Sequence, residues 1–160
     1  MSLFKYLLIL PFLALTACGF APVYGTDGSA NVLLNSVLVQ EPKTRDHYLL
    51  TRQLEKRLGR AADPRFDLGV SVSTSLKALG INSIGNINRY NLLGTTQYTL
   101  RDTQTGQIVS SGEVNSFTSY SAAGSTISSQ ATREDAQERL MIILADKLID
   151  HIIATADLPS

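Results

Sequence analysis

The chain of 160 residues lacks tryptophan and has one cysteine and two histidines. A lone cysteine, Cys18, excludes a disulfide bond within the chain. The histidines, His47 and His151, are far apart and have no histidine or cysteine at the spacing of metal ligands. The sequence therefore predicts no zinc site, and both histidines are expected to be structural.

Signals of catalysis are also missing. The chain has many serines, but none lies in the Gly-x-Ser-x-Gly turn of a serine hydrolase. The segment Gly80–Gly85 lacks the Lys-Ser/Thr ending of a phosphate-binding loop. Carboxylates are few on the predicted strands. We therefore expect no enzyme and no cofactor.

An excess of positive charge is absent as well. The 14 lysines and arginines balance 14 aspartates and glutamates. Removing Lys5 with a predicted signal segment leaves 13 basic against 14 acidic residues. Nonspecific nucleic-acid binding requires many basic contacts to phosphates, so a nucleic-acid partner is not expected.

The first residues have the pattern of a secretion signal. Lys5 precedes an apolar run at residues 6–15, which is shorter than the roughly 20 apolar residues of a membrane-spanning helix. The run ends in Leu-Thr-Ala-Cys-Gly at residues 15–19, which resembles the lipobox of bacterial lipoproteins. An ordinary signal peptide that happens to have a cysteine near its cleavage site is the alternative.

The lipobox resemblance implies cleavage before Cys18, diacylglycerol on its sulfur and a fatty-acyl chain such as palmitate on its new amino group. Three acyl chains would anchor the protein stably in a membrane. Gly19 stands where an inner-membrane lipoprotein has aspartate, which implies the outer membrane. We expect residues 1–17 to be a cleaved signal, 18–30 a lipidated cysteine with a tether, and 31–160 a single periplasm-facing domain.

Hydrophobic patterning predicts a strand at residues 32–39 and a helix from about Asp46 that ends at Gly59. Residues 66–78 alternate between apolar and polar, which predicts a long half-buried strand. Two further strands, at about 88–102 and 107–120, follow in a meander, with a glycine-containing turn at 103–106 and a bulge at Gly112.

A last helix is predicted from Thr132, as its cap, to about Thr155. Its apolar face is expected to contain Leu140, Ile143, Leu144, Leu148 and Ile152. The order β-α-β-β-β-α predicts an α+β fold, a two-layer sandwich with two helices packed on one face of a four-stranded, mainly antiparallel sheet. The other sheet face is expected to be polar.

The tip of the hairpin between the first two long strands is a candidate site. Ile81, Ile84 and Ile87 stand there among glycine and asparagine, and such residues either contact a partner or lipid or fold back onto the sheet. Lys77 and Arg89 are predicted to be neighbours on the polar face, where they could bind a phosphate or carboxylate head group. Solvated charges are the alternative for this pair, and the favoured interpretation of Arg101.

The order of these features resembles the LptE family of lipopolysaccharide (LPS) assembly lipoproteins, in particular its alphaproteobacterial branch. The resemblance rests on the lipobox, Cys-Gly-Phe-Ala-Pro-Val-Tyr-Gly at 18–25, Phe-Asp-Leu-Gly-Val at 66–70, Tyr-Thr-Leu-Arg-Asp at 98–102 before the Thr105-Gly106 turn, and a long C-terminal helix. It covers essentially the whole mature chain, although each motif alone is weak.

The resemblance implies a non-enzymatic plug inside the outer-membrane β-barrel LptD, which supports barrel assembly and LPS insertion. The expected partners are LptD, LPS and the membrane, through the lipid anchor. An auxiliary lipid-anchored binding lipoprotein of an envelope ABC transport system is the alternative, and an enzyme of cell-wall metabolism is a more distant one.

Overall fold

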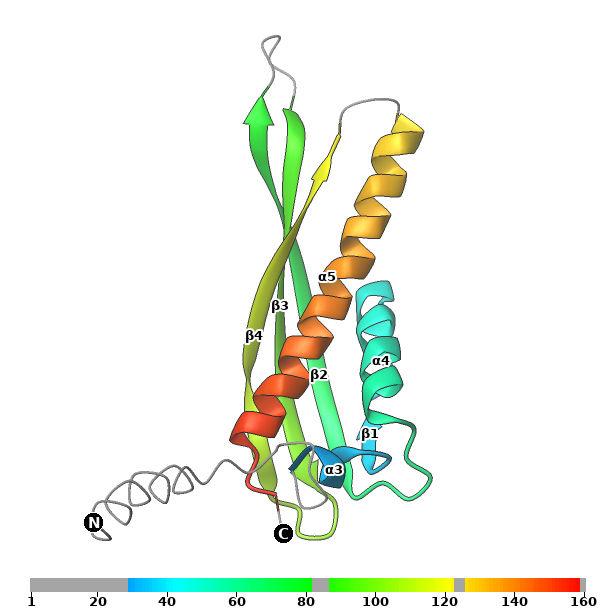
Figure 1. Ribbon diagram of the computed structural model, residues 1–160, viewed down its shortest axis with the longest axis vertical. Coiled ribbons are helices and arrows are strands. Elements are labelled where there is room, and N and C mark those ends of the chain that lie inside the picture. Colours follow the sequence, from blue (N-terminus) through cyan, green and yellow to red (C-terminus); the bar gives the residue numbers. More distant parts are fainter. Residues whose placement is uncertain (1–28, 82–86, 123–125, 159–160) are drawn as a thin grey trace, which may run out of the picture.

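The computed structural model describes residues 29–81, 87–122 and 126–158. Within these ranges the elements are α3 (Ser29–Leu33), β1 (Val37–Val39), α4 (Arg45–Leu58), β2 (Phe66–Ile81), β3 (Ile87–Asp102), β4 (Ile108–Ser121) and α5 (Thr126–Thr155). The sheet order is β1-β2-β3-β4, with β1 parallel to β2 and the other neighbours antiparallel. Helices α4 and α5 pack against each other on one face of this sheet (Figure 1). The predicted α+β sandwich is confirmed, with α3 as an additional short helix.

The alternation of side chains decides which sheet face meets the helices. Even-numbered residues of β2, β3 and β4 are register partners and face α4 and α5. Their buried members form the centre of the core together with the apolar stripes of the helices: Phe66, Leu68, Leu92, Leu100, Val114, Leu140, Leu144 and Leu148. The odd-numbered residues face away from the helices, as the sequence predicted.

Helix α4 begins and ends as the sequence indicated. The Thr44 side chain accepts a hydrogen bond from the backbone N–H of His47 and so caps the first turn. Gly59 ends the helix with φ of 80°, a backbone conformation that favours glycine. The predicted stripe, His47, Leu50, Leu54 and Leu58, is buried.

The strand predicted at residues 32–39 is mostly wrong. Its first residues belong to α3, Asn35 turns the chain with φ of 55°, and β1 contains only three residues. The Ser36 hydroxyl donates a hydrogen bond to the carbonyl of Val32 across this turn. A short apolar run does not distinguish a helix from a strand, which explains the error.

The predicted start of the last helix is also wrong, because α5 begins at Thr126 rather than at Thr132. The Thr132 hydroxyl lies inside the helix and is 3.0 Å from the carbonyl of Ser129. The predicted apolar face is buried at four of its five positions, whereas Ile143 is 37% exposed.

Gly112 does not form a bulge, because it pairs regularly with Tyr98, and the irregularity lies between Leu100 and Arg101. A Cβ at Gly112 would lie 2.9 Å from Cε1 of His151, so the glycine makes room for that ring. The described residues contain no helix with the length and hydropathy needed to cross a membrane.

The two long strands make the molecule asymmetric along its length. β2 and β3 have 16 residues each and continue well past the N-terminal end of α4 (Figure 1). We call the part beyond that point, towards the β2–β3 hairpin, the distal end. Here only the first turn of α4 reaches the sheet, where the Thr74 hydroxyl donates a hydrogen bond to Asp46 at 3.1 Å, and residues 73–79 of β2 are all exposed.

Candidate functional site

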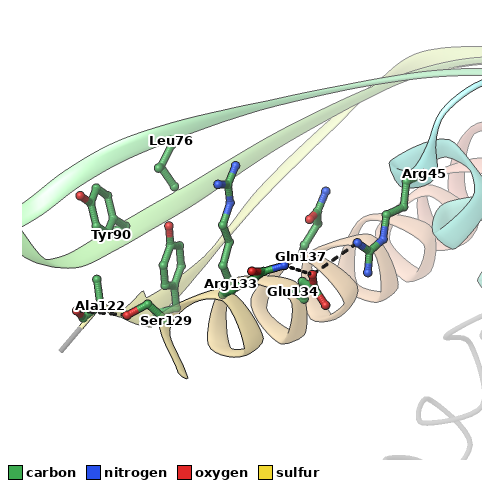
Figure 2. Close-up of a pocket in the computed structure, with 10 residues that line it drawn as sticks. Arg45, Leu76, Tyr90, Ala122, Ser129, Arg133, Glu134 and Gln137 are labelled. Atoms are coloured by element: carbon green, nitrogen blue, oxygen red, sulfur yellow. Dashed lines mark hydrogen bonds and ion pairs between the residues drawn. The ribbon is translucent and has the colours of Figure 1, made fainter. Parts of the chain in front are cut away.

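A cavity of about 530 Å³ lies at the distal end, between the sheet and the first turns of α4 and α5 (Figure 2). Three strands and both helices contribute to its walls. The lining residues are Arg45, Leu76, Tyr90, Tyr120, Ala122, Ser129, Gln130, Arg133, Glu134 and Gln137. The distal cavity is therefore a product of the tertiary fold and not of a contiguous motif.

The sheet side of the distal cavity is aromatic and apolar. Tyr90 of β3 and Tyr120 of β4 are register partners, and their rings stack with centroids 5.4 Å apart and an interplanar angle of 18°. Leu76 of β2 lies beside them and is 44% exposed. Stacked rings with an adjoining aliphatic group offer a flat surface to a sugar ring or a hydrocarbon chain.

The helix side of the distal cavity is charged. Arg45 lies 3.7 Å from Glu134, and Gln137 donates a hydrogen bond to Asp46. Arg133 forms no ion pair with any described residue, and Figure 2 shows its side chain reaching from α5 towards the strands. A guanidinium beside stacked rings is a combination that can bind an amphipathic anion.

The predicted basic pair lies on the opposite face of the sheet. Lys77 pairs with Asn91, and Arg89 is two residues away on the same strand and face as Asn91. Both basic side chains are exposed. A register shift between Ala78 and Gly80 pairs Arg89 with Gly80, so Lys77 and Arg89 lie on neighbouring strands on either side of this irregularity and on the same sheet face.

Four other predicted site residues are described only in part or not at all. Cys18 and Ile84 lie outside the described residues. Ile81 and Ile87 pair as backbone partners at the end of the hairpin, and their side chains are not among those described. Lipidation and the role of the isoleucines therefore stay predictions.

Two features were not predicted from the sequence: the distal cavity and an apolar pair on the polar face of the sheet. Leu93 and Phe117 are cross-strand partners there, 38% and 60% exposed. The distal cavity depends on the register between β3 and β4 and on Ser129 and Gln130, which belong to the part of α5 before Thr132. The stacking of Tyr90 on Tyr120 could have been found from the strand alternation, had the register been known.

Both histidine rings make contacts within the fold. The His151 ring contacts the Tyr98 hydroxyl, which is 3.1 Å from the Ser110 hydroxyl. Burial and the nearby Lys43 ammonium lower the pKa of His47 below its ordinary value of 6.5. Within the described ranges no three histidine, cysteine, aspartate or glutamate side chains lie together as a metal site would require.

Comparison with known proteins identifies one family. The LptE family, described as lipopolysaccharide-assembly, matches residues 34–152. That range contains the whole sheet and nearly all of α4 and α5. No curated protein sequence matches the chain.

Solved structures of bacterial lipoproteins share the fold. A lipoprotein from Caulobacter crescentus CB15 has a TM-score of 0.65 and 24% identity, over 78% of this chain and 93% of its own. The rare lipoprotein B from Shewanella oneidensis has a TM-score of 0.58 and 14% identity, over 75% and 93%. A minor lipoprotein from Acinetobacter baumannii has a TM-score of 0.56 and 20% identity, over 78% and 95%.

Proposed function

Because the chain belongs to the LptE family of lipopolysaccharide-assembly proteins, we propose that it is an outer-membrane lipoprotein that plugs the LptD β-barrel. In this role it supports assembly of the barrel and insertion of LPS into the outer leaflet, without catalysing a reaction. The family match over residues 34–152 is the observation that carries the proposal. The polar odd-numbered face of the sheet suits the water-lined lumen of a barrel.

The lipid anchor is the second part of the proposal. Cys18, acylated on its sulfur and its amino group, would hold the domain at the inner leaflet of the outer membrane, on the periplasmic side. The short segment up to residue 30 would keep the sheet close enough to enter a barrel from below. Mass spectrometry of the mature protein tests this part, and an unmodified Cys18 would contradict it.

The distal end is the part of the domain that we assign to LPS. An LPS molecule combines anionic head groups, sugars and acyl chains, and the distal end offers a matching set of groups. Lys77 and Arg89 on the open face and Arg133 in the distal cavity supply positive charge for phosphates. Tyr90 and Tyr120 supply a stacked surface, and Ile81, Ile84 and Ile87 are the residues we expect to meet acyl chains.

Detergent extraction followed by affinity purification of the full lipoprotein tests the plug. We expect one barrel protein to co-purify in equal amount with it. Recovery of an inner-membrane ATPase complex instead would overturn the proposal in favour of an auxiliary lipoprotein of an ABC transport system.

Charge reversal tests the LPS assignment. Lys77→Glu with Arg89→Glu, and separately Arg133→Glu, should weaken LPS binding while the melting temperature stays near that of the wild type. Lys56→Glu on the exposed face of α4 is the matched control for Arg133→Glu, because it changes the charge by the same amount away from the distal end. LPS binding that is equal in all variants would remove these residues from the proposal.

A further inference from the structure

The sheet has two outer edges, and they differ in how their backbone groups are covered. On β4, three outward carbonyls accept hydrogen bonds from the C-terminal part of the chain. Val109 accepts from the Asp157 backbone N–H at 3.1 Å, and Asn115 accepts from Lys147 Nζ at 3.0 Å. Ser119 accepts from an Arg139 guanidinium nitrogen at 3.5 Å. These three carbonyls of the β4 edge are therefore covered by α5 and the segment that follows it.

The β2 edge is covered only at its beginning. β1 pairs with residues 66–68, where the Phe66 N–H donates to the Ser36 carbonyl at 3.0 Å and the Leu68 carbonyl accepts from the Gln40 N–H at 2.9 Å. N–H and C=O of one residue point to the same side of a strand, and the side alternates along it. The even-numbered residues from 70 to 78 therefore point their backbone groups away from β3. None of these groups has a hydrogen bond to another described residue.

The solvent exposure of the residues along this part of β2 agrees with an uncovered edge. Every residue from 73 to 79 is exposed, including Leu76 at 44% and Leu79 at 50%. Proteins usually protect a free edge with proline, charge or a very short strand. This stretch contains no proline and one charge, Lys77, which lies on the open face. An edge of this length and hydrophobicity is a template for another strand.

We propose that the β2 edge around Thr74, Leu76 and Ala78 binds an extended segment of the LptD partner by β-strand addition. The identity of the partner rests on the proposed function. Strands in a closed barrel wall have their backbone groups paired, so the added segment comes from outside that wall. The residues along the β2 edge predict the sequence of this added segment. It should have no proline at the pairing positions, apolar side chains beside Leu76, and an acidic residue on the sheet face of Lys77.

Proline substitution tests the edge in the full lipoprotein co-expressed with the barrel. Leu76→Pro removes an outward N–H without removing a hydrogen bond to β3. It should lower recovery of the barrel partner about tenfold or more, because strand pairing at the edge is blocked. Leu76→Ala controls for the side chain, and Asn115→Pro makes the matched change on the covered β4 edge. Asn115→Pro should recover the partner nearly as well as the wild type, and Leu76→Ala should recover clearly more of it than Leu76→Pro.

The outcomes separate the two proposals. Recovery by Leu76→Pro equal to that of the wild type overturns the edge proposal alone, whereas a wild-type protein that recovers no barrel overturns the proposed function as well. A photo-crosslinking residue at Ala78 keeps the test independent of the stability of the proline variant. Crosslinks to an extended segment of the barrel protein are expected. Crosslinks only to a second copy of this chain, or none, overturn the proposal.

Discussion

At the scale of single residues, two buried threonines differ in whether their side-chain hydroxyl forms a hydrogen bond. Thr96 is fully buried, and its hydroxyl has no partner among the described residues. The Thr118 hydroxyl donates to the Ala136 carbonyl of α5 at 2.8 Å. We expect Thr96→Val to raise the free energy of unfolding by about 1 kcal/mol and Thr118→Val to lower it by about 1 kcal/mol. Urea denaturation measures both, and a loss at Thr96 would show that its hydroxyl is satisfied.

His47 gives a prediction about pH. Burial first, and Lys43 second, lower its pKa below 6.5, so the folded protein binds this proton less tightly than the unfolded chain. Its contribution to stability is complete above pH 6.5 and is lost as the pH falls through that value towards the folded pKa.

Replacing His47 by asparagine should therefore reduce the drop in melting temperature between about pH 7.5 and about pH 5.5. The amide oxygen can take the place of Nδ1, which accepts a hydrogen bond from the Lys43 N–H at 3.3 Å. Calorimetry at the two pH values measures the difference. A drop as large as in the wild type would assign the pH dependence to other groups.

At the scale of elements, Gly94 determines how closely α5 packs on β3. A methyl group at this position would lie 2.8 Å from Leu144 Cδ1 and 3.0 Å from Leu140 Cδ2, and both leucines are fully buried. We expect Gly94→Ala to cost about 1–3 kcal/mol. Gly69→Ala on β2 is the control, since its nearest contacts would be 3.8 Å away and its effect should stay within about 0.5 kcal/mol. Similar losses at both positions would contradict this account.

The elements that the sequence predicted correctly are those in which the hydrophobic pattern repeats over many residues. The alternation of apolar and polar residues from Phe66 onward predicted β2, and the apolar stripe of residues 47–58 predicted α4. Both predictions were correct because the burial pattern repeats over several residue pairs of the strand or several turns of the helix. The start of α5 could not be predicted, since residues 126–131 are small or polar apart from Ile127, and such a composition is equally typical of a loop. Gly112 looked like a bulge because its contact with His151, 39 positions later in the sequence, is tertiary.

At the scale of the whole molecule, the candidate site was predictable only where it depended on neighbouring strands. The hairpin alone placed Lys77 and Arg89 on one face, and the register agrees. The distal cavity brings Arg45, Tyr90 and Arg133 together from segments separated by more than 40 residues. Such proximity follows from the packing of α4 and α5, which sequence patterns do not specify.

The same asymmetry predicts that stability and binding separate along the length of the molecule. Leu100 and Leu76 both lie on the helix-facing side of the sheet, but Leu100 is fully buried and Leu76 is 44% exposed at the distal cavity. We expect Leu100→Ala to cost about 2–5 kcal/mol of unfolding free energy, because it leaves a hole in a packed core.

Leu76→Ala should cost less than about 1 kcal/mol, because little buried surface is lost, and yet weaken LPS binding. Urea titration and LPS binding of the two single variants give the comparison. An equal loss of stability at both positions would mean that the distal end is as tightly packed as the base of the sheet, and would leave it without a surface free to bind.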